Sequence, residues 1–125
     1  MLIADDHAYV LEGLVSLLQD RFDVVATVTD GHQLVEAAVR LGPDVIVTDI
    51  SMPGLNGIEA IARLKAAGSE ARIIVLTLHA RAEIAAELIR AGASGFVVKP
   101  LAASELVTAI EQVLLGGIYL TPAVE

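Results

Sequence analysis

Four short apolar runs, each ended by an acidic, hydroxyl or basic residue, constrain the fold of this chain most strongly. The runs at 45–47 and 73–76 are apolar at every position, without the polar alternation of a half-exposed strand. Such runs are typical of strands covered on both faces, as in a parallel sheet with helices on either side. The expected strands are residues 1–4, 24–28, 44–48, 72–77 and 95–98.

Stretches with helical periodicity separate these strands. Apolar residues recur on one stripe over about residues 8–20 and 31–41, and again near 58–65, 84–89 and 106–114. Glycines follow the last periodic residues, which is how helices commonly stop. Strand–helix units in series predict an α/β fold: a single (βα)5 doubly wound parallel sheet, flavodoxin-like, with strand order 2-1-3-4-5.

The composition limits the class of protein. A chain of 125 residues fits one domain, and 55% apolar with 19% charged residues is typical of a globular protein. The formal net charge of -8 argues against direct binding to a polyanion such as DNA. The absence of cysteine excludes disulfides and thiolate metal sites, and no apolar stretch approaches membrane-spanning length. We therefore expect a cytoplasmic protein without membrane contact.

The polar ends of the runs predict a binding site. In a parallel sheet the carboxyl ends of the strands meet at one edge, where a pocket would collect Asp5, Asp6, Asp49, Thr77 and Lys99. Each residue alone has an ordinary explanation, because an aspartate commonly caps a helix and a threonine fits a strand. Two adjacent acids exceed what capping needs, however, and carboxylate oxygens suit a divalent cation. The coincidence at four strand ends favours a site for a cation and a phosphoryl group.

Several motifs together resemble a response-regulator receiver domain, over essentially the whole chain. They are the acidic pair Asp5-Asp6, the segment 49–54 with Asn56-Gly57 after it, Thr77 closing one run, and Lys99-Pro100 closing the next. The stretch 91–96 and the tail 116–122 further resemble regulators of the NarL/FixJ type. In that group a LuxR-type helix-turn-helix DNA-binding domain follows such a tail.

The resemblance implies a metal site and a phosphoacceptor. Asp49 would accept the phosphoryl group, and Mg²⁺ would be held directly by Asp6, Asp49 and the Ser51 carbonyl, and largely through water by Asp5. The protein would thus catalyse its own phosphorylation without being a turnover enzyme.

The resemblance also implies roles at the ends of the last two strands. Thr77 and Lys99 would contact the phosphoryl group and form the catalytic set with Asp49. Thr77 and Phe96 would be the switch residues, and the bond before Pro100 is a candidate cis peptide. His7 and His79 are interpreted as bystanders near the site, because the sequence shows no metal-binding spacing between them. The bulky Leu78 is expected to narrow access to Asp49.

Residues 1–116 are expected to form the receiver, and 117–125 to begin a linker to a C-terminal DNA-binding domain outside this chain. The expected partners are a sensor histidine kinase, a second copy of the chain upon phosphorylation, and DNA only through that further domain. The first strand has only four residues before Asp5, so we expect the natural chain to begin a few residues earlier or the given chain to be cut there. We likewise expect the natural chain to continue past Glu125.

Three alternatives remain open from the residues alone. The first is a stand-alone receiver that acts by phosphorelay or by docking on a protein. The second is a Mg²⁺ phosphohydrolase, which would need a second carboxylate two residues after its nucleophile, whereas Asp49 is followed by Ile50 and Ser51. The third is a degenerate receiver that binds a partner without phosphorylation, which the complete set of site residues disfavours.

Overall fold

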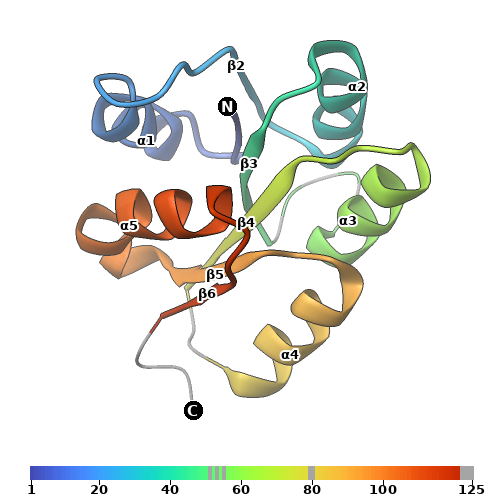
Figure 1. Cartoon of the computed structure of the whole chain (residues 1–125). Helices are drawn as coiled ribbons and strands as arrows, with labels where there is room; N and C mark the ends of the chain where they lie inside the picture. The colour runs from blue at the N-terminus through green and yellow to red at the C-terminus, as the bar shows by residue number, and fades with distance from the viewer. Residues whose placement is uncertain (51, 53, 55, 79–80, 122–125) are drawn as a thin grey trace.

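A computed structural model describes residues 1–50, 52, 54, 56–78 and 81–121 of the chain. The described residues form one parallel sheet with helices on both faces (Figure 1). The strands are β1 (Leu2–Ala4), β2 (Ala26–Val28), β3 (Val45–Asp49), β4 (Arg72–Thr77), β5 (Gly95–Val98) and β6 (Tyr119–Leu120). The helices are α1 (Ala8–Leu18), α2 (Gly31–Leu41), α3 (Gly57–Ala66), α4 (Ala82–Ala91), the 3₁₀ turn η1 (Lys99–Leu101) and α5 (Ala102–Leu114).

The strand order is β2-β1-β3-β4-β5-β6, and every adjacent pair is parallel. The predicted order of the first five strands and the doubly wound fold are therefore confirmed. The order in which strands are added reverses at β1, since β2 lies on one side of it and β3 on the other. Their carboxyl ends meet there, and this is where a ligand site is expected.

The sixth strand was not predicted. Tyr119 and Leu120 pair with Gly95 and Phe96 of β5, so part of the segment 117–125 belongs to the sheet. The segment that the sequence analysis expects to begin a linker thus contains a short strand of the sheet. A strand of two residues is too short to show a hydrophobic period, which explains why the pattern does not reveal it.

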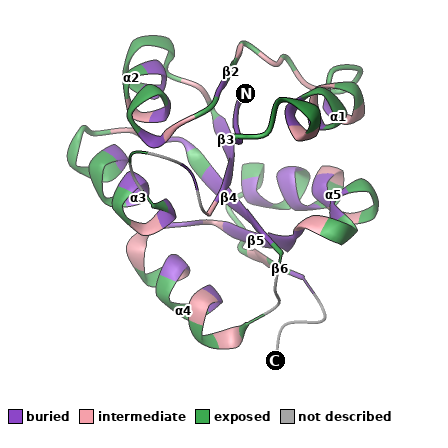
Figure 2. Ribbon diagram, turned by 180° about the vertical axis from the view of Figure 1, so that it is seen from behind, coloured by how far each residue is buried: buried purple, intermediate pink, exposed green. Residues whose placement is uncertain are grey.

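Two apolar cores lie on the two faces of the sheet. One packs α1 and α5 against it, and the other packs α2, α3 and α4 against the opposite face (Figure 1). β1, β3 and β5 are buried at every position and β4 at every position but Arg72 (Figure 2), and Ile46, Val47, Ile73 and Ile74 are fully inaccessible to solvent. This double cover is the physical reason that the runs in β3 and β4 lack polar alternation.

Local signals fix where two of the helices start. Asp30 precedes α2, and its side chain accepts a hydrogen bond from the Gln33 backbone. Asn56 precedes α3 and exchanges hydrogen bonds with Glu59 through both its amide atoms. Such caps satisfy the free amide groups of a first turn and are worth about 1 kcal/mol each. Among the helices that the structure describes, none is both long and apolar enough to cross a bilayer.

Candidate functional site

The carboxyl edge of the sheet brings together the acidic and hydroxyl residues predicted from the sequence. Asp5 follows β1, Asp49 ends β3 and Thr77 ends β4, so strands that are adjacent in space present them at one edge. All three are buried: Asp5 is 0% exposed, Asp49 6% and Thr77 5%. Buried carboxylates are costly unless a cation or hydrogen bonds compensate them.

Lys99 supplies a compensating charge. Its Nζ lies 2.8 Å from Asp5 Oδ2 and 3.1 Å from Asp49 Oδ2, so one ammonium bridges the ends of β1 and β3. Burial by itself would lower the pKa of Lys99, but the two carboxylates that it contacts raise this pKa by more, leaving it above its ordinary value of 10.5. Lys99 is therefore charged at neutral pH.

The donor set fits a divalent cation. The nearest ligand atoms of Asp5, Asp6, His7 and Asp49 all lie within 4.8 Å of one another. Three carboxylates face a single ammonium, so the formal charge of these four groups is -2. Apart from Lys99 Nζ at 2.8 Å, the fully buried Asp5 Oδ2 has no polar partner among the described residues. Mg²⁺ is the ion that such oxygen donors suit, because it favours carboxylate ligands and retains several waters.

His7 also lies at the cluster, although its sequence pattern indicates only a bystander near the site. Its backbone amide donates a hydrogen bond to Asp5 Oδ1 over 2.9 Å. Its ring Nδ1 lies 3.0 Å from Asp6 Oδ1 and 3.3 Å from Asp5 Oδ1. The signal that pointed to this placement was its position directly after the acidic pair, in the short connection between β1 and α1.

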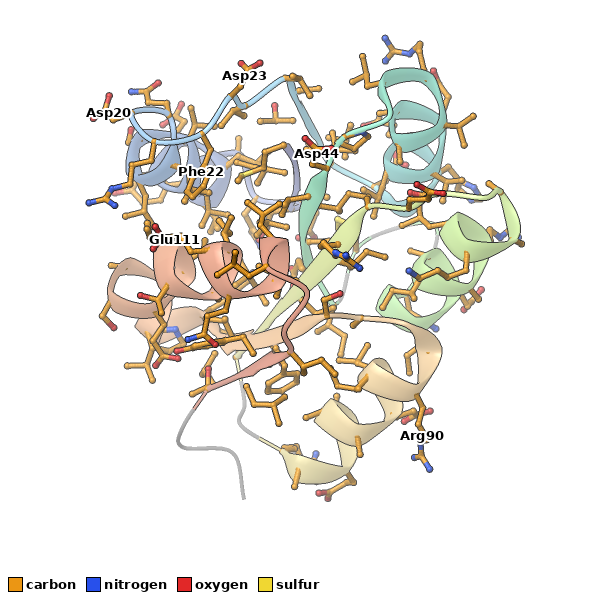
Figure 3. All side chains as sticks on the ribbon, in the orientation of Figure 1. Asp20, Phe22, Asp23, Asp44, Arg90 and Glu111 are labelled. Carbon is orange, nitrogen blue, oxygen red and sulfur yellow. The ribbon has the colours of Figure 1, made fainter. Side chains whose placement is uncertain are left out.

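Other acidic residues lie elsewhere. Asp23 and Asp44, labelled in Figure 3, come before β2 and β3, so they lie toward the amino edge of the sheet. Asp20, just after α1, and Glu111, within α5, are labelled in the same view. The acidic cluster with a bridging lysine therefore belongs to the carboxyl edge and not to acidic surface in general.

The remaining predicted site residues differ in outcome. Phe96 is fully buried in β5, three residues before Lys99. Ser51 lies outside the described residues. Pro100 corrects an expectation, since no peptide bond among the described residues is cis. Pro100 lies in the η1 turn, where its fixed φ suits a helical start and no cis bond is needed.

The end of the described chain is fastened beside Lys99. The Thr121 backbone donates to the Phe96 carbonyl over 2.9 Å, and Thr121 Oγ1 accepts from the Val98 amide over 3.0 Å. Tyr119 adds a hydrogen bond from its hydroxyl to Glu105 of α5 over 2.9 Å. Thr121 is 1% exposed. The tail is thus hydrogen-bonded along the outer edge of β5, the strand that ends directly before Lys99.

Comparison with known proteins gives consistent matches. A family model described as the response regulator receiver domain matches residues 1–111. The transcriptional regulatory protein DegU of Brevibacillus brevis is 36% identical over 99% of this chain and 53% of its own length. The nitrate/nitrite response regulator protein homolog of Haemophilus influenzae is 34% identical over 100% of this chain and 61% of its own length. The chain thus spans little more than half the length of such relatives.

Solved structures match equally well. The two-component response regulator of the LuxR family from Aurantimonas sp. SI85-9A1 superposes with a TM-score of 0.92 at 35% identity, covering 98% of this chain and 89% of that one. The isolated REC domain of RcsB from Salmonella enterica serovar Typhimurium, solved with phosphomimetic BeF3-, gives a TM-score of 0.89 at 30% identity, covering 98% of this chain and 93% of that one.

Proposed function

The chain belongs to the response regulator receiver family, and on that premise we propose that its Asp49 carboxylate accepts a phosphoryl group in a Mg²⁺-dependent transfer from a sensor histidine kinase. The observation that carries the proposal is the Lys99 bridge to Asp5 and Asp49 at 2.8 and 3.1 Å. This bridge supports a site in which the two carboxylates and the ammonium act together. Response regulators are signalling proteins, and we assign no turnover activity to this chain.

The chemistry follows from the charges of the site residues. An oxygen of ionised Asp49 attacks phosphorus, the phosphorus–nitrogen bond of the donor phosphohistidine breaks, and its electron pair stays on the departing imidazole nitrogen. The product on this chain is an acyl phosphate. Because the Lys99 ammonium contacts the free Asp49 carboxylate, it can contact a phosphoryl oxygen once Asp49 is phosphorylated. A fixed ammonium in a buried site lowers the barrier mainly by position and electrostatic field.

Mg²⁺ would be held by Asp5, Asp6 and Asp49, with the Ser51 carbonyl as the further ligand expected from the family. When bound, it would offset the repulsion between anionic donor and anionic acceptor. The short β1–α1 connection and the end of β3 place the three carboxylates together.

Transmission of the signal starts at two strand ends. Thr77 pairs with Val98 in the register of β4 and β5, so its backbone lies beside the residue that precedes Lys99. A phosphoryl group with about -1.5 to -2 charge can draw both side chains toward itself through new hydrogen bonds. Because Phe96 is buried on the same strand, we propose that it repacks in response. The change is a shift in population between two packings.

The output is proposed to be control of transcription. DegU and similar relatives carry the word transcriptional in their names, and the chain corresponds to about half of their length. We propose that residues 1–116, extended by β6, form the receiver and that a DNA-binding domain follows the tail. The protein would work in the cytoplasm, without membrane contact, and would dimerise when phosphorylated.

Intact-mass spectrometry tests the proposal. The purified chain is incubated with acetyl phosphate and Mg²⁺, and wild type is compared with Asp49→Asn and with a reaction in which EDTA removes the metal. We expect one phosphoryl group on the wild type and none in either control. A mass gain that persists in Asp49→Asn, or an unmodified wild type at all donor concentrations, would refute the assignment of Asp49.

A further inference from the structure

We propose that His7 is an additional ligand of the divalent cation, through Nδ1, and that it shifts the site toward ions that accept nitrogen, such as Ni²⁺. The inference rests on the proposed metal site at Asp5, Asp6 and Asp49 and specifies its selectivity. A site formed only by carboxylates, carbonyls and water would favour Mg²⁺, whereas an imidazole suits the transition metals.

The distances around Nδ1 match those between neighbouring ligands of one ion. Two donors of an octahedral ion with bonds of about 2.1 Å lie about 3.0 Å apart. Nδ1 of His7 lies 3.0 Å from Asp6 Oδ1 and 3.3 Å from Asp5 Oδ1. An ion placed against both carboxylates is therefore within reach of the ring nitrogen by a small rotation.

The backbone directs the ring toward the acids. The amide of His7 donates to Asp5 Oδ1, which folds the Asp5–His7 segment back on itself and brings its side chains together. His7 is the residue before α1, with an extended φ of -103° and ψ of 110°. Within the described part of the chain its side chain makes no capping hydrogen bond to that helix. The ring is thus not occupied with holding the start of α1.

Exposure and charge are also compatible with ligation. The His7 side chain is 67% exposed, Asp6 29% and Asp5 0%, so these three residues grade from solvent to the interior. A neutral imidazole adds a ligand without adding negative charge to a cluster that already holds three carboxylates. His7 would occupy a coordination position that Mg²⁺ leaves to water. It would therefore raise the affinity of the site chiefly for nitrogen-accepting ions.

The competing explanation is that His7 only donates a hydrogen bond from its ring to the acids. In that case the ring would affect all divalent ions alike, through charge and orientation. Ion selectivity separates the two explanations, because a direct nitrogen bond changes the ratio of two affinities and a hydrogen bond does not.

The test is calorimetric titration of the untagged chain with Mg²⁺ and separately with Ni²⁺. The variants are His7→Ala, His7→Asn, which keeps an oxygen donor, and His32→Ala as a matched histidine on α2. We expect both His7 variants to lose Ni²⁺ affinity by at least about tenfold, with a much smaller change for Mg²⁺. Loss of a residue that only hydrogen-bonds to a metal ligand already costs about 10–100-fold in metal affinity. His32→Ala should leave both affinities unchanged.

Spin-echo spectroscopy of bound Mn²⁺ gives a second readout, one that does not depend on affinity. Wild type should show coupling to an imidazole nitrogen, and His7→Ala should lose it. Equal losses for both ions, or nitrogen coupling that survives in His7→Ala, would overturn the inference. If Ni²⁺ affinity is lost in His32→Ala instead, the bound ion is adventitious and the inference is also wrong. The proposed function fails separately, by absence of the Mg²⁺-dependent mass gain in wild type.

Discussion

Replacing Lys99 by methionine probes the centre of the site directly. Methionine keeps a long unbranched side chain but removes the ammonium that lies 2.8 Å from Asp5 and 3.1 Å from Asp49. The change leaves two buried carboxylates facing each other without a positive charge. Removing one partner of a buried ion pair costs about 3–5 kcal/mol.

The lower end of that range applies here, because the Lys99 side chain is still 16% exposed. We therefore expect the free energy of unfolding to fall by about 3 kcal/mol in the absence of a divalent ion. Unfolding entropy is about 2.1 cal/mol/K per residue, or about 0.26 kcal/mol/K for 125 residues. The melting temperature should thus drop by about 11 °C.

Thermal unfolding followed by far-ultraviolet circular dichroism measures this drop. Arg40→Met is the matched control, since Arg40 forms an exposed pair with Glu36 at 3.7 Å. Such a pair is worth about 0.5 kcal/mol or less. Saturating Mg²⁺ should recover most of the loss in Lys99→Met, because a cation at one hundred times its Kd adds about 2.7 kcal/mol.

The pH range of the effect follows from the raised pKa of Lys99. Its native pKa lies above 10.5, so the stabilising contribution is fully present below pH 10.5 and is lost as pH rises through the native value. The difference in unfolding free energy between wild type and Lys99→Met should be constant near neutral pH and should disappear only in strong alkali. A loss below about 1 kcal/mol, no larger than that of the Arg40 control, would refute the bridging role of Lys99.

Two further predictions concern Tyr119 and Leu78. Burial, and then the hydrogen bond to Glu105, raise the pKa of Tyr119 to about 12 from 10.0, so a Tyr9→Phe chain should show one phenolate transition near pH 12 by absorbance. The same shift means that stability is retained below pH 10 and lost between pH 10 and 12; Glu105→Gln should lower the midpoint, and an unchanged midpoint would contradict the Glu105 contact. Leu78 is 64% exposed directly after Thr77, and Leu78→Ala should speed labelling by acetyl phosphate by up to about tenfold, equivalent to about 1.4 kcal/mol in the barrier. Equal rates in mass-spectrometric time courses would show that Leu78 does not narrow access to Asp49.

The fold was predictable because its central strands carry a strong signal. Ile46 and Ile74 belong to apolar runs that only a doubly covered sheet can bury, and the order of strands then follows from short right-handed connections. β6 escapes this logic, since two residues held by hydrogen bonds to β5 show no period of their own. Its position depends on a long-range pairing that local pattern does not encode.

The site was predictable to the level of which residues meet, but not how they are partnered. The edge rule places Asp5, Asp49 and Lys99 together, while only the structure shows that Lys99 bridges the two acids. The sequence places His7 near the site but does not show its contacts, because these depend on how the chain folds back after β1. Pro100 misled because the trans preference of such bonds is small, and the structure uses its ring to begin a turn.

The short β6 strand has a consequence for how this domain tolerates being cut. Without residues 119–121, the Phe96 carbonyl and the Val98 amide on the rim of β5 would lose their hydrogen-bond partners and face water. A bare strand rim of this kind is a template on which other chains add strands, leading to aggregation. We therefore expect a fragment ending at Gly116 to stay folded yet precipitate, because the tail that covers the edge of β5 is missing.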